Sequence, residues 1–112
     1  MGLFGSAKPD VAQLEAKGDI PGLIKAMQYK NDVWIPIKAI QALGRLKDAR
    51  AVPALGSTLP SLGGNRAYAI ISLGEIGDES ALEILFNYLA DESHFVRAAV
   101  VDALGKIGGE KC

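Results

Sequence analysis

The apolar residues of this chain recur with the spacing of amphipathic helices. From Ile20 to Met27, and again from Leu82 to Leu89, apolar side chains stand at positions i, i+3, i+4 and i+7. This spacing places them on one face of a helix that is buried on one side. The pattern predicts an all-α chain in which short and long helices alternate. Short helices are expected at 10–17, 20–29, 51–59 and 80–89, and long helices at 33–47, 65–77 and 94–107.

Side chains that cap helices mark where these elements begin. Asp19, Asp48 and Asp78 stand just ahead of the predicted short helices, and Asp32 and Ser93 stand ahead of two long ones. A side-chain oxygen at such a position accepts a hydrogen bond from a free N–H group of the first turn. The caps therefore support the predicted helix starts.

A Leu-Gly pair recurs near the end of each long helix, with its glycines at Gly44, Gly74 and Gly105. A regular period of about thirty residues is typical of stacked repeats, in which each unit contacts mainly its neighbours. Glycine inside a helix costs about 1 kcal/mol relative to alanine. Two explanations stay open: a close approach of neighbouring helices, or a loosened last turn before the bend.

The repeated unit resembles the HEAT-like repeats of the phycobilisome-lyase type. The clearest copy runs from Gly74 to Gly105 and includes Gly77-Asp78 and Phe95-Val96-Arg97, and a second copy of the linker and short helix begins at Asp48. The resemblance covers residues 16–109. It implies a right-handed α-solenoid of about three helix pairs after a short N-terminal helix, in a prokaryotic protein. The single cysteine, which cannot form an internal disulfide, leads us to expect a reducing, cytoplasmic location. We expect one repeat domain over 9–112, with units at 19–48, 49–78 and 79–109, after a flexible arm over 1–8.

Two segments depart from the repeat pattern. The arginine of the motif is present as Arg66 and Arg97, but Pro36 takes its place in the first unit. Proline is tolerated there because the first turn of a helix has no partner for its N–H group. The loop at 60–64 is short and rich in glycine, and we expect it to be distorted or mobile.

Composition and motifs argue against most kinds of chemistry. Apolar residues make up 49% of the 112 residues and the net charge is −1, which fits a globular protein and not a dedicated nucleic-acid binder. No apolar run approaches the roughly 18 residues of a membrane span. His94 is the only histidine and Cys112 the only cysteine, so we expect no metal site, no cofactor, no catalytic residues and no disulfide. The start of the chain formally matches a myristoylation pattern at Gly2.

The remaining signal lies in side chains at expected surface positions. Tyr68 and Ile71 are apolar where the other units are mostly polar, and aromatic residues are favoured in binding hot spots. We therefore expect protein contacts at six positions, although each could equally be a packing residue. They are Tyr29, Trp34, Tyr68, Ile71, Ile84 and Tyr88.

The C-terminal helix is predicted to lack a following partner. Val101, Leu104 and Ile107 are expected to face open space, whereas solenoids normally end in a polar cap. We expect that the chain forms a homodimer through this helix, that the helix folds back, or that a partner covers it.

These observations predict a non-enzymatic scaffold or adaptor module that binds a protein partner of unknown identity. We expect neither nucleic acid nor a membrane as a partner. The alternative, implied by the family name, is a subunit of a bilin lyase or isomerase-like enzyme that attaches a chromophore. The shortness of the chain counts against that alternative.

Overall fold

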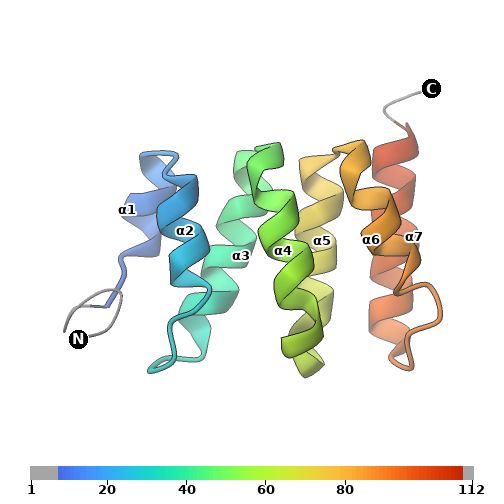
Figure 1. Cartoon of the computed structure of the whole chain (residues 1–112), viewed down its shortest axis with the longest axis horizontal. Helices are drawn as coiled ribbons and strands as arrows, with labels where there is room; N and C mark the ends of the chain where they lie inside the picture. Colours follow the sequence, from blue (N-terminus) through green and yellow to red (C-terminus); the bar gives the residue numbers. More distant parts are fainter. Residues whose placement is uncertain (1–7, 110–112) are drawn as a thin grey trace.

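The computed structural model describes residues 8–109 and shows an α-solenoid of two helical layers (Figure 1). One layer holds α1 (Val11–Ala16), α3 (Trp34–Leu46), α5 (Arg66–Ile76) and α7 (His94–Gly109). The other holds the short helices α2 (Ile20–Ala26), α4 (Val52–Thr58) and α6 (Leu82–Phe86). In the first layer α3 packs on α1, α5 on α3 and α7 on α5. The predicted all-α solenoid is thus confirmed, while the arm predicted at 1–8 and Cys112 fall outside the described residues, except for Lys8.

Aspartate caps begin the short helices as the sequence predicts. Asp19 accepts a hydrogen bond from the N–H of Gly22 at 2.9 Å, three residues ahead. Asp48 and Asp78 instead accept from N–H groups two residues ahead, at 2.9 and 3.0 Å. The tighter geometry goes with a first turn of 3₁₀ helix at Ala49–Ala51 and Glu79–Ala81. For this reason α4 and α6 start later than the apolar pattern predicts.

The ends of α2 and α6 also differ from the prediction. The N–H of Gln28 bonds to the carbonyl of Lys25, and the N–H of Tyr88 bonds to that of Leu85. Bonds that span three residues tighten the final turn and end the α-helix. As a result, α2 ends at Ala26, one residue before the last apolar residue of its stripe, and α6 ends at Phe86, three residues before Leu89.

Left-handed residues end two of the long helices. Lys47 after α3 has φ 54°, and Gly77 after α5 has φ 75°. Both positions precede an aspartate cap, so the chain reverses there and enters the next short helix. The loop at 60–64 is distorted as predicted: it forms two 3₁₀ turns, at Leu59–Ser61 and Gly63–Asn65, and Gly63 has φ 53°.

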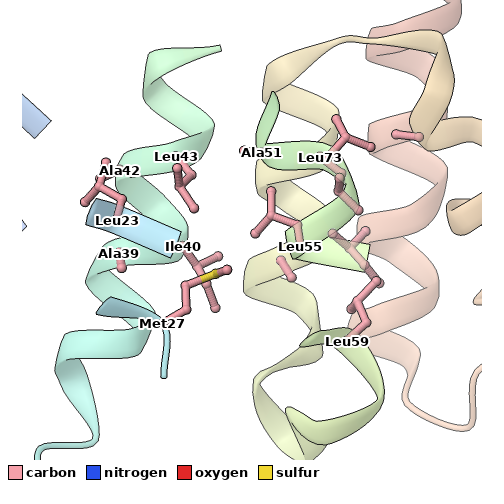
Figure 2. Packing of buried hydrophobic residues seen from close by; sticks show 14 of the residues in the cluster. Leu23, Met27, Ala39, Ile40, Ala42, Leu43, Ala51, Leu55, Leu59 and Leu73 are labelled. Atoms are coloured by element: carbon pink, nitrogen blue, oxygen red, sulfur yellow. The ribbon is translucent and has the colours of Figure 1, made fainter. Parts of the chain in front are cut away.

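The core lies between the two layers and runs along the stack. Figure 2 shows Leu23 and Met27 of the α2 segment facing Ile40 and Leu43 of α3, with Leu55 of α4 further along. All five side chains are buried. Leu73 and Leu85 continue the cluster toward α7. Burial of such side chains contributes roughly 1.5–3 kcal/mol each, so the repeat-to-repeat core is the main stabilising element.

The glycines of the repeat allow neighbouring long helices to approach closely. A Cβ atom on Gly44 would lie 2.8 Å from Oγ of Ser72, and one on Gly74 would lie 2.8 Å from Cα of Ala103. Both distances are shorter than side chains permit. Ser72 uses the close approach of α3 and α5 to donate a buried hydrogen bond to the carbonyl of Ile40, at 2.8 Å. Of the two explanations left open, close approach is therefore confirmed at Gly44 and Gly74, whereas Gly105 has no such neighbour within 4 Å.

Candidate interaction surfaces

The six predicted contact residues are divided between the two layers. Trp34 is 58% exposed and Ile71 is 43% exposed, and both belong to the layer of long helices. The other four are half-buried and pack against the core: Tyr29, Tyr68, Ile84 and Tyr88. The first two residues are therefore accessible, and the last four combine packing with partial exposure.

A second exposed aromatic residue was missed in the sequence. Phe95 is 71% exposed near the start of α7, and Trp34 stands at the start of α3, beside Val33, which is 74% exposed. Both long helices begin at the lower edge of the stack in Figure 1. Trp34 and Phe95 lie two repeat periods apart, so comparison of the first and third units could have identified Phe95 from the sequence.

The last helices of the stack leave an apolar surface open, which we call the C-terminal end and define by Phe86, Leu89 and Val101. Their side chains are 54%, 43% and 64% exposed. The position of Phe86 within the repeat explains why its side chain is exposed. Gly56 in α4 faces Ile84 of the next short helix, and Phe86 occupies the equivalent position in α6, where no short helix follows among the described residues.

One part of the prediction for this end is wrong. Ile107 was expected to face open space, but it is only 1% exposed, and Leu104 is half-buried. Val96, Val100 and Ala103 are buried on the same side of α7 as Ile107. This side of α7 packs on α5 and α6. Only Val101 of the three expected residues points away from the stack.

Charged side chains join the second and third units. Arg66 Nη2 donates to Asp91 Oδ1 at 3.0 Å, and Arg97 Nη1 donates to the carbonyl of Asp91 at 2.6 Å. The N–H of Ser93 donates to the same carboxylate at 2.9 Å. This backbone hydrogen bond, followed by the hydrogen bond from Arg66, holds the pKa of Asp91 below its usual value. The two arginines of the repeat motif therefore hold the loop between α6 and α7 in place, which is a structural role.

Grooves indent the surface formed by the described residues. One, of about 580 Å³, lies between α1 and α3, and its lining includes the ion pairs Lys8–Asp32 and Glu15–Arg45. Arg45 and Glu15 meet there at 2.7 Å, and the hydrogen bond from Arg45 lowers the pKa of Glu15. The smaller groove, of about 340 Å³, lies between α2 and α4 and is lined only by uncharged side chains.

Residues 8–109 contain no cluster of three or more histidine, cysteine, aspartate or glutamate side chains that could bind a metal ion. No helix within that range is both long and apolar enough to cross a membrane. His94 stands exposed at the start of α7, with its ring against that of Phe95.

Comparison with known protein families agrees with the repeat geometry. A model described as HEAT repeats matches residues 64–111, which include all of α5, α6 and α7. A model described as the PBS lyase HEAT-like repeat matches residues 35–59, which include nearly all of α3 and all of α4. A search of curated proteins gave no match. The matched segments carry the Leu-Gly pairs, the aspartate caps and the alternating helices described above. The two matched segments are therefore HEAT-like repeats, of the PBS lyase HEAT-like type over residues 35–59 and of the HEAT type over residues 64–111.

Proposed function

We propose that this protein is a non-enzymatic scaffold or adaptor that binds a protein partner along the layer formed by α2, α4 and α6. The observation that carries the proposal is the architecture itself. The short helices α2, α4 and α6 lie in one row on the long helices (Figure 1). They present exposed side chains such as Lys25 and Glu83. A solenoid exposes such an extended surface without needing to enclose a small molecule.

The chemistry of the surface supports a protein partner. The net charge of −1 does not favour the phosphate backbone of nucleic acids. Exposed aromatic and apolar side chains beside half-buried tyrosines, as at Tyr29 and Tyr88, are typical of protein interfaces. The two grooves are open to solvent at their sides, and the described residues lining them include no histidine or cysteine nucleophile.

A photo-crosslinking experiment tests which layer binds. Benzoylphenylalanine is placed at Lys25, Ser57 or Glu83 in the short-helix layer, and at Gln13 or Lys38 in the long-helix layer as matched controls. All five positions are exposed. After irradiation in cells that produce the protein, we expect a discrete protein adduct from the first three positions and several-fold less from the controls. Equal adducts from both layers, or none from the short helices, would overturn the proposal.

We also propose that the C-terminal end pairs with the same end of a second copy. The exposed residues of α1 at the opposite end are polar or small, as with Ala12, Gln13 and Ala16. Head-to-tail stacking would place Phe86 and Val101 against small and polar side chains that offer no large apolar group to pack on. A two-fold arrangement instead buries apolar side chains of both copies against one another, as isologous interfaces do.

A further inference from the structure

The outward side of α7 repeats the contact by which the long helices pack on one another. In each long helix a β-branched residue is followed four positions later by the repeated glycine. Residues at this spacing lie on the same face of a helix. The three pairs are Ile40 with Gly44 on α3, Ile70 with Gly74 on α5, and Val101 with Gly105 on α7.

The next long helix covers this face on α3 and on α5. Both isoleucines are buried there. Ser72 of α5 comes so close to the glycine of α3, and Ala103 of α7 to that of α5, that neither glycine has room for a Cβ atom. On α7 the face is open: Val101 is 64% exposed, and no neighbouring atom lies within 4 Å of the place of a Cβ on Gly105. Among the described residues, α7 therefore presents without an occupant a face that binds a helix elsewhere in the stack.

The first helix of a second copy does not fit this face. The residues that meet the glycines inside the stack are small, since Ser72 and Ala103 occupy the same position of the repeat. In α1 that position holds Gln13, which is exposed. A side chain of this length between two closely packed helices overfills the contact and separates them. Head-to-tail stacking of copies is therefore unfavourable at Gly105.

The open face is complementary to itself. Val101 projects from α7, and Gly105, one turn further along, leaves a gap beside it. When two copies of α7 lie side by side and antiparallel, the valine of each copy lies over the glycine of the other, as two-fold symmetry requires. A parallel pair would set valine against valine and glycine against glycine. The gap at the glycines would then stay empty, and the atoms around it would lose packing contacts.

We propose that the partner at the C-terminal end is a second copy whose α7 runs antiparallel to α7 of the first, with Val101 of each copy packed on Gly105 of the other. This inference rests on the two-fold pairing proposed above and adds the helix, the direction and the residues in contact. The same two-fold axis places α6 of both copies on one side of the paired helices, so Phe86 and Leu89 border the contact.

Disulfide trapping in the full chain tests the direction of the paired helices. Ala98 lies three residues before Val101 and Gly108 three residues after Gly105, so the two lie opposite each other across the antiparallel pair; both are exposed. Ala98→Cys and Gly108→Cys are each combined with Cys112→Ser. An oxidised mixture of the two variants should give a disulfide-linked dimer. Neither variant should crosslink by itself, because like positions lie about 15 Å apart along the helices and a disulfide needs Cα atoms within about 7 Å. Crosslinking of each variant with itself, and not in the mixture, would overturn the antiparallel contact.

Filling the gap supplies the second test. Gly105→Ala places a methyl group where Val101 of the second copy packs, so the dissociation constant measured by light scattering should rise at least about tenfold. The methyl group meets no neighbouring atom of its own chain within 4 Å, so the variant should keep the circular dichroism of the folded wild type. Gly64→Ala is the matched control. It also meets no atom within 4 Å, but it lies in the loop before α5, and it should dimerise like the wild type.

The outcomes separate this contact from the pairing itself. A wild-type dimer that Gly105→Ala leaves unchanged would overturn the contact at the glycine, while the two-fold pairing through Phe86 and Leu89 would stand. A wild type that is monomeric at every concentration would overturn both.

Discussion

Two glycines at the same position of the repeat, Gly74 and Gly105, have different surroundings. At Gly74 the Cα and Cβ atoms of Ala103 already occupy the space next to the backbone, at 2.8 Å from the place of a missing Cβ. At Gly105 the same space is empty. The two residues occur in the same Leu-Gly context, one repeat apart, so they form a natural matched pair.

Alanine at these two positions should act in opposite directions. Gly74→Ala forces α5 away from α7 and should lower the free energy of unfolding by about 1–3 kcal/mol, as overpacking does. Gly105→Ala meets no neighbouring atom and should raise it by up to about 1 kcal/mol, because alanine favours the helix. Urea unfolding of both variants measures the two changes. Similar losses in both would contradict the assignment of close packing to Gly74.

At the scale of elements, the loop between α6 and α7 is held by a carboxylate. Asp91 receives hydrogen bonds from Arg66 at the start of α5 and from the backbone of Ser93, and its side chain is only 9% exposed. The Nε atom of Arg66 is buried and has no hydrogen-bond partner among the described residues. The hydrogen bonds from Arg66 and Ser93 that hold this loop therefore depend on Asp91 being ionised.

This attachment should weaken in acid. The pKa of Asp91 is lowered in the folded protein, first by the backbone hydrogen bond from Ser93 and then by the hydrogen bond from Arg66. A lowered carboxyl pKa stabilises the fold above the unfolded value of about 3.9, and that contribution disappears as pH falls through the folded pKa. The stability difference between the wild type and Asp91→Asn should be largest near neutral pH and shrink in acid. Thermal unfolding at a series of pH values measures it, and a difference that does not vary with pH would contradict the role of the charge.

At the scale of the whole molecule, the two ends of the stack differ in character. The C-terminal end exposes Phe86, Leu89 and Val101, whereas exposed positions of α1 carry polar or small residues. Contiguous exposed apolar side chains mark association surfaces in soluble proteins. The difference between the ends is the basis of the two-fold pairing proposed above.

Light scattering across a dilution series tests that pairing. We expect the wild type to form a dimer that dissociates on dilution, and Val101→Glu to remain monomeric because pairing would bury its carboxylate without an opposite charge. Gln13→Glu at the opposite end should leave the dimer intact. A wild type that is monomeric at every concentration, or a Val101→Glu variant that still dimerises, would show that the C-terminal end is not the interface.

The sequence by itself determined the helices, their order and the repeat register. These depend on contacts within a few residues: the apolar stripe from Ile20 to Met27, the caps at Asp19, Asp48 and Asp78, and Pro36 in the first turn of α3. The same caps and apolar spacings recur in each of the three units. Aligning the units with one another therefore reveals the repeat register from the sequence. The same comparison would have revealed Phe95.

Only the tertiary structure decided which side chains those helices bury. Gly74 and Gly105 share a sequence context but not an environment, and Ile107 is buried where exposure was expected. The predicted contact residues were likewise divided between exposed and half-buried positions. The physical reason is that burial between helices depends on the rotation of each helix and on what packs beside it, and residues about thirty positions apart in the chain supply those neighbours.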